Sequence, residues 1–209
     1  MRNRSLKIIC ALVIFCTVIL SFCACSNGSA PKLDDVKERF SYLLDNSHEI
    51  NEIIWGDGLP TIVYGSDEDK EHKIYDEKTF DGYEYIREDC EYQTVEQIKI
   101  AAEKIYSKNY LKDIYVQVFD GYTINTEHYN LAKYIENTKG FFKYSLDENI
   151  KVEKLIFDFS TMKIVEGSRA DYVNVEISAA PENNPSESFV MKVSFILEDG
   201  EWYLDSPSF

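Results

Sequence analysis

Residues 172–204 read YVNVEISAAPENNPSESFVMKVSFILEDGEWYL, and this stretch decides the fold class. In its first part, Val173, Val175 and Ile177 alternate with polar residues. Side chains of a β-strand point alternately to the two faces of a sheet, so a period of two is typical of a strand with one buried face. The stretch therefore begins with a strand whose apolar side is predicted to face a core.

The second part of the stretch predicts a hairpin. Residues 189–198 alternate in the same way, with large apolar side chains at every second position. Asp199-Gly200 follows, and an Asp-Gly pair suits the two-residue turns that join neighbouring antiparallel strands. Trp202 and Leu204 then return on the next strand. Together the two parts predict an antiparallel meander.

Further strands are expected upstream of this meander. The candidates are Thr61–Tyr64, Ala132–Glu136, Phe141–Tyr144 and Val152–Phe159. Two more, Lys73–Tyr75 and Tyr83–Ile86, are expected to pair with each other around the turn-rich residues between them.

Helical spacing dominates earlier in the chain. Apolar residues recur three and four positions apart from Leu33 onward, and acidic residues lie between them. This pattern predicts one amphipathic helix, whose apolar positions are Val36, Phe40, Leu43, Leu44, Ile50 and Ile54. Glycine and proline break helices, so the helix should end in the turn Trp55–Pro60.

A capping box predicts the start of a second helix. Thr94 is followed three residues later by Gln97, a pairing in which each side chain can bond a free backbone N–H of the first turn. Its buried side is expected to carry Val95, Ile98, Ala102 and Ile105. A third, short helix is predicted to carry Tyr110, Ile114 and Val118 and to end at Asp120-Gly121.

The order of these elements predicts an α+β fold. Helices come first and an antiparallel meander comes last, which is typical of helices packed on one face of a sheet. We expect N-terminal helices packed on a curved antiparallel sheet.

The first 25 residues are typical of an exported lipoprotein. Three basic residues and no acidic one precede an apolar run over residues 8–22. That run is about 15 residues long, shorter than the roughly 20 that a membrane-spanning helix needs. The run ends in Cys23-Ala24-Cys25, and this end resembles a lipobox, the signal for attaching lipid to a cysteine thiol.

We expect residues 1–24 to be removed as a signal peptide and Cys25 to carry the lipid. Residues 25–31 are then a lipidated tether, and residues 32–209 form a single α+β domain. The protein would be exported and held on the outer face of the cell membrane by its lipid. The alternative is an ordinary signal peptide cut near Ala24, which releases a soluble protein.

The charge of the chain excludes one class of partner. Its net charge is −15, and removing residues 1–24 takes away three basic residues and no acidic one, which gives −18. Nucleic-acid binding proteins neutralise phosphates with lysine and arginine patches, so a nucleic acid partner is not expected. A basic protein or wall-bound cations suit such a field better, and the equally good alternative is that the charge serves solubility alone.

The chemistry expected of an enzyme is missing from the sequence. Cys90 is the only cysteine after Cys25, so no internal disulfide is expected, and Cys90 itself is predicted to be a buried, small apolar residue. His48, His72 and His128 form no metal-ligand or catalytic pattern. We therefore predict no catalytic residues, no metal and no cofactor.

Aromatic residues are the more suggestive feature. The chain has 15 tyrosines, and exposed aromatic rings bury a large area at low entropy cost when a partner binds. Trp55 lies in a glycine-flanked turn rather than in a periodic element. We take Trp55, Asp57 and Tyr64 as candidate partner-binding residues. Packing of Trp55 over the end of the first helix is an equally good interpretation.

The closing segment Asp199–Phe209 resembles the last hairpin of cystatin-like and NTF2-like domains of secreted bacterial proteins. More narrowly, it resembles the close of the IseA family, whose members inhibit the DL-endopeptidases that cut peptidoglycan stem peptides. Trp55–Pro60, Ala132–Glu136 and Gly140–Phe142 add to the resemblance.

The resemblance implies a non-enzymatic protein that occludes the active site of a peptidoglycan hydrolase. The acidic surface fits this, because many wall-bound enzymes are basic, and complementary charge mainly speeds encounter. The main alternative is a small-ligand-binding NTF2-like module at the cell surface, which would hold a molecule between sheet and helix. An enzyme comes third, since it would need an acid or histidine with a shifted pKa in a cleft.

Overall fold

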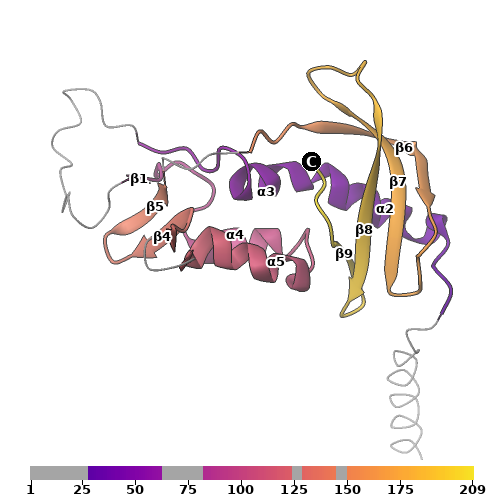
Figure 1. The fold of residues 1–209 in the computed structure, drawn as a ribbon, viewed down its shortest axis with the longest axis horizontal. Helices are drawn as coiled ribbons and strands as arrows, with labels where there is room; N and C mark the ends of the chain where they lie inside the picture. Colours follow the sequence, from indigo (N-terminus) through magenta and orange to yellow (C-terminus); the bar gives the residue numbers. More distant parts are fainter. Residues whose placement is uncertain (1–27, 63–81, 124–128, 145–149) are drawn as a thin grey trace, which may run out of the picture.

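Two consecutive helices, α2 (Leu33–Asp45) and α3 (Ser47–Ile54), connect two antiparallel sheets in the computed structural model (Figure 1). The structure describes residues 28–62, 82–123, 129–144 and 150–209. The predicted signal peptide, Cys25, Tyr64, His72, His128 and the strand expected at Lys73–Tyr75 lie outside the described residues. The helices and the antiparallel sheets give the α+β class that the sequence predicts.

The larger sheet has the strand order β6-β7-β8-β9, with every neighbouring pair antiparallel. Its strands are β6 (Leu155–Ile164), β7 (Tyr172–Pro181), β8 (Phe189–Glu198) and β9 (Glu201–Leu204). The meander predicted from residues 172–204 is confirmed. Asp199 and Gly200, at φ 51° and 88°, form the predicted two-residue turn, because a type I′ turn needs positive φ at both positions.

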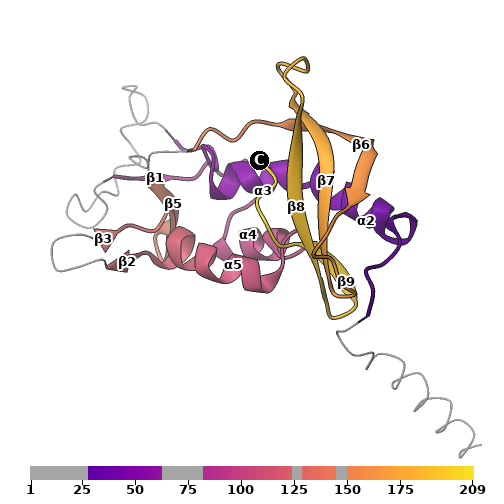
Figure 2. The same ribbon diagram turned by 45° about the vertical axis from the view of Figure 1, so that its right-hand side comes forward.

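Helix α2 packs across one face of this sheet, as Figures 1 and 2 both show. The Phe40 ring stacks on Phe195 of β8 with centroids 3.8 Å apart and planes 3° apart. Trp202 of β9 meets the same ring edge-on at 5.4 Å. Arg39 donates from Nε to the Trp202 carbonyl at 3.0 Å. These contacts fill the space between helix and sheet with aromatic side chains.

The prediction of a single N-terminal helix is wrong at Asn46, where the chain leaves helical geometry at φ −99° and ψ 3°. The Asn46 side-chain amide donates to the Tyr42 carbonyl at 2.7 Å, and the Ser47 hydroxyl donates to the Leu44 carbonyl at 2.9 Å. Asparagine and serine compete in this way with the helical backbone bonds. The predicted end of the helical region is confirmed, because α3 ends at Ile54.

The predicted second and third helices are confirmed as α4 (Val95–Ala102) and α5 (Lys108–Tyr115). Thr94 Oγ1 accepts a bond from the Gln97 amide at 3.1 Å, while the Gln97 side chain accepts one from Gln93 N at 2.6 Å. A π-helical turn, η2 (Val116–Asp120), continues α5 and stops at Gly121, as predicted.

The smaller sheet has the order β1-β5-β4 and lies at the far end of α3. Its strands are β1 (Tyr83–Tyr85), β4 (Tyr134–Asn137) and β5 (Gly140–Tyr144), and a separate pair joins β2 (Tyr122–Thr123) to β3 (Tyr129–Asn130). β1 pairs with β5. Of the strand predicted at Thr61–Tyr64, Thr61 forms an isolated bridge with Ile86, and residues 63–64 lie outside the described residues.

The segment from β9 to the C-terminus bonds to the α4–α5 connection and to α3. The Leu204 amide donates to Ile105 at 2.9 Å, and the Ser107 amide donates to Leu204 at 2.8 Å. Ser208 Oγ lies 2.8 Å from the Tyr106 hydroxyl and accepts a bond from the Asn51 side chain at 3.0 Å. The start of the described chain lies elsewhere, because the Ala170 amide donates to the Gly28 carbonyl at 3.1 Å, in the connection between β6 and β7.

Replacing Phe40 should destabilise the protein strongly. Phe40 is fully buried against Phe195 and Trp202, so Phe40→Ala leaves a cavity and should lower the free energy of unfolding by about 3–5 kcal/mol in urea titrations. Tyr42→Ala, on the exposed side of the same helix, is the control and should cost under about 1 kcal/mol. Equal costs would contradict the packing of α2 on the sheet.

Candidate functional site

The turn Trp55–Pro60 is held by side chains from the smaller sheet and from the residue directly before β4. Lys133, which is buried, donates from Nζ to the carbonyls of Ile54 at 3.3 Å and Gly56 at 2.5 Å. The Ile54 carbonyl is the last of α3, where a helix carries partial negative charge and favours a cation, and Gly56 follows two residues later in the turn. The ammonium therefore fixes the end of the helix from which the turn starts.

Two further side chains hold the rest of this turn. The Tyr134 hydroxyl donates to Ile53 O at 2.9 Å and accepts a bond from the Leu59 amide at 2.9 Å. Lys143 donates from Nζ to the Asp57 carbonyl at 2.7 Å, and partial burial lowers the pKa of this lysine. The segments Trp55–Pro60 and Ala132–Glu136 thus contact each other directly.

Of the three residues predicted from the sequence to bind a partner, the two that the structure describes differ in their exposure. Trp55 is half-buried in an aromatic cluster, with its ring 5.0 Å from Phe209, 5.8 Å from Tyr106 and 6.4 Å from Tyr110. This geometry favours the interpretation in which Trp55 packs over the end of the helix. Asp57 is exposed in the same turn, while Tyr64 lies outside the described residues. Asp57 is therefore the candidate that a partner can reach.

A groove of about 350 Å³ opens beside the turn. It lies between α3, the turn and the loop Arg87–Tyr92, which we call the 87–92 loop. The lining residues are Glu49, Glu52, Ile53, Gly58, Leu59, Pro60, Arg87, Asp89, Cys90, Glu91 and Tyr92. The sequence did not predict this groove, because no motif joins α3 to the 87–92 loop.

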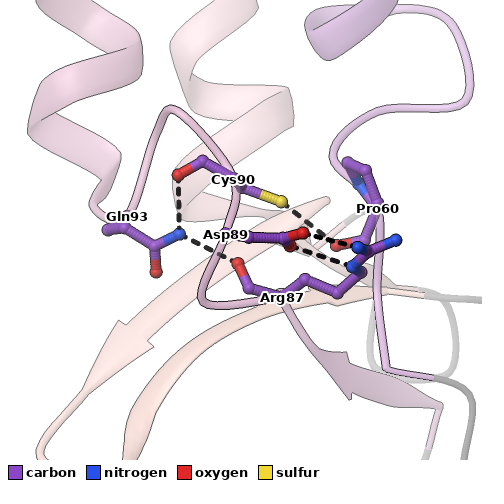
Figure 3. Close-up of polar contacts among 5 residues, drawn as sticks. All are labelled: Pro60, Arg87, Asp89, Cys90 and Gln93. Atoms are coloured by element: carbon purple, nitrogen blue, oxygen red, sulfur yellow. Dashed lines mark hydrogen bonds and ion pairs between the residues drawn. The ribbon is translucent and has the colours of Figure 1, made fainter.

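Hydrogen bonds from Gln93 and an ion pair within the loop hold the 87–92 loop (Figure 3). The Gln93 side-chain amide donates to the carbonyls of Arg87 and Cys90, each at 2.9 Å. Arg87 pairs with Asp89 through two bonds, at 2.9 Å and 2.5 Å. Pro60 O accepts from the Arg87 amide at 3.1 Å and from Cys90 Sγ at 3.6 Å, which ties the loop to the turn.

Cys90 is half-buried in the groove rather than fully buried as the sequence suggested. Burial, with Asp89 nearby, raises the pKa of its thiol. Reactive cysteines need a lowered pKa, because the thiolate is the nucleophile. His48, the histidine that the described part of the chain contains, lines a different cavity. These observations support a packing role for Cys90, and in the described part of the chain the one histidine lies away from it.

The second cavity lies between the α2–α3 junction and β6, and it measures about 180 Å³. Its floor is built from the buried side chains of Ser47, Asn51 and Ser208, which bond to one another and to Tyr106. Ligand pockets usually measure about 300–1,000 Å³, so this cavity is small for such a role.

Within the described part of the chain, no group of histidine, cysteine and carboxylate side chains would hold a metal ion. None of the helices described there is both long enough and apolar enough to cross a membrane. No model of a known protein family matches the chain, and no curated protein matches it.

Gly58→Ala should lower the free energy of unfolding by more than the strain of its positive φ alone accounts for. Gly58 has φ 75°, and an added Cβ would clash with the Tyr134 hydroxyl. We expect a loss of about 2–4 kcal/mol in the free energy of unfolding, from the strained φ and from displacement of Tyr134. Gly200→Ala is the matched control, because Gly200 has φ 88° but open space around it, and should cost about 1–2 kcal/mol. Equal losses would show that Tyr134 does not constrain the turn.

Alkaline pH should lower the free energy of unfolding, because the protein contains buried tyrosines. Burial raises the pKa of Tyr134 and Tyr106 above the ordinary value near 10. Above about pH 10 the unfolded chain therefore loses phenolic protons that the folded chain keeps, so stability falls as pH rises, by about 1.4 kcal/mol per pH unit for each such tyrosine. Denaturant titrations at pH 9 to 11 should give Tyr134→Phe a shallower slope than the unmodified protein. An unchanged slope would contradict the burial of this hydroxyl.

Proposed function

We propose that this chain is an exported cell-envelope lipoprotein that binds and inhibits a peptidoglycan hydrolase of the DL-endopeptidase class, without catalysing a reaction. The lipid would be carried by Cys25. The resemblance to the IseA family, together with a cystatin-like or NTF2-like fold with a curved sheet, belongs to the same proposal.

One observation carries the proposal, namely that the turn Trp55–Pro60 exposes Asp57 and Pro60 while its backbone is held by Lys133, Tyr134 and Lys143. A binding loop that is already ordered loses little conformational entropy when it enters a partner's cleft. The turn also presents the Asp57 side chain to solvent. A rigid, acidic projection of this kind suits the occlusion of a basic active-site cleft.

The geometry gives less support to the alternative, a small-ligand-binding module. Such a module would hold its ligand between helix and sheet, and Phe40, Phe195 and Trp202 fill that space. The cavity of about 180 Å³ with its polar floor is the place where a small polar ligand would be sought.

The test is digestion of purified cell walls by a DL-endopeptidase from the same organism, with the lipidated protein added in detergent micelles. Stoichiometric slowing that weakens as salt is added is the expected result, because screening reduces the attraction between an acidic inhibitor and a basic enzyme. Undiminished digestion at a large molar excess would remove this enzyme class as the target.

Asp57→Asn should weaken inhibition by about tenfold, because it removes the charge at the tip of the turn and leaves the shape unchanged. Asp113→Asn on α5 is the matched control, since it removes one exposed carboxylate elsewhere and should leave inhibition unchanged. Both variants should unfold at the urea concentration of the unmodified protein. Equal inhibition by the two variants would rule out contact through Asp57.

A further inference from the structure

The rim of the groove carries charge that the described part of the chain leaves uncompensated. Arg87 and Asp89 neutralise each other through their two bonds. Glu49, Glu52 and Glu91 remain, and among the described residues none of the three forms an ion pair. Three like charges around one concavity repel one another, so a cation placed among them would be attracted.

The floor of the same groove is apolar. Ile53 and Leu59 are buried beneath it, and Pro60 and Cys90 line its side. A small hydrated cation would gain nothing from such a floor. Lysine and arginine side chains match it better, because they lay an apolar stem along a hydrophobic surface and keep a charged head at its edge.

The groove is also ordered before anything binds. Lys133 and Tyr134 hold the end of α3, and Gln93 closes the 87–92 loop. Tyr92 donates from its hydroxyl to Glu49 Oε1 at 3.0 Å, which orients that carboxylate and, with burial, raises the pKa of the tyrosine. Because these groups are already positioned, binding would cost little ordering of the site.

We propose that this groove receives a lysine- or arginine-bearing segment of a protein partner, with the aliphatic stem on Ile53 and Leu59 and the cationic head among Glu49, Glu52 and Glu91. The inference rests on the proposed function in taking the partner to be a protein. It adds a second contact beside the Asp57 turn. At the turn, Asp57 would project into a cleft of the partner, whereas at the groove a side chain of the partner would lie in a concave surface of this chain. The size of the groove, about 350 Å³, is within the range of ordinary binding pockets.

The test compares two triple variants of the full chain in detergent micelles. The groove variant is Glu49→Gln, Glu52→Gln and Glu91→Gln, which keeps the shape and the acceptor oxygens. The control variant, Glu38→Gln, Glu166→Gln and Glu187→Gln, removes the same charge from exposed positions elsewhere. The probe is a fluorescein-labelled peptide, Gly-Lys-Leu-Lys-Gly, whose binding is followed by fluorescence anisotropy.

The groove variant should bind the peptide at least about tenfold more weakly than the unmodified protein, while the control variant should change by less than about threefold. A peptide with glutamine in place of lysine should not bind, and one with 2,4-diaminobutyric acid in place of lysine, which keeps the positive charge on a shorter aliphatic stem, should bind more weakly. Equal weakening in both triple variants, or equal binding of the lysine and diaminobutyric acid peptides, would overturn the inference, because general charge attraction would then explain the binding.

The wall-digestion assay separates this inference from the proposed function. If the unmodified protein slows digestion and the groove variant slows it equally well, the groove inference is wrong and the inhibitor function stands. If the unmodified protein does not slow digestion, the inhibitor function is wrong. The peptide titrations then decide whether the groove binds basic segments of a different protein.

Discussion

The arrangement of the molecule depends on a buried polar cluster in which Ser47, Asn51, Tyr106 and Ser208 bond to one another. These residues come from α3, the α4–α5 connection and the C-terminal segment, so the cluster fixes α3 against the rest of the chain. Every buried side-chain polar atom in the described residues has a partner. Removing one member would leave others buried and unsatisfied, which costs more than the bond itself contributes.

Fixing α3 also fixes the candidate site, because both the turn and one wall of the groove continue from this helix. One side of α3 bonds to the buried cluster through Asn51, and its C-terminal carbonyls bond to Lys133 and Tyr134. A helix of eight residues is too short to be stable alone, so its order comes from these contacts. The turn and the groove are therefore positioned by the core beneath them.

The parts of the fold predicted from the sequence are those set by local patterns. Alternation and the Asp199-Gly200 pair specify the C-terminal meander, and Thr94 with Gln97 specifies the start of α4. The break at Asn46 was not predicted, because apolar spacing continues across it and the Asn46 and Ser47 bonds do not alter that pattern. The groove could not be predicted either, since its walls meet through tertiary contacts, namely the bonds to the Pro60 carbonyl and the bond from Tyr92 to Glu49.

The bond between Gly28 and Ala170 has a consequence for reach. For a chain anchored at Cys25, three residues span at most about 10 Å between the lipid and the β6–β7 end of the domain. From there α2 and α3 extend away through 13 and 8 residues, about 30 Å of helix, to the turn (Figure 1). The helices would act as a stiff spacer that sets the distance at which a target is met. A longer flexible segment before Gly28 would widen the range of distances between the membrane and the turn, and it would not increase the affinity of the recognition surface for its target.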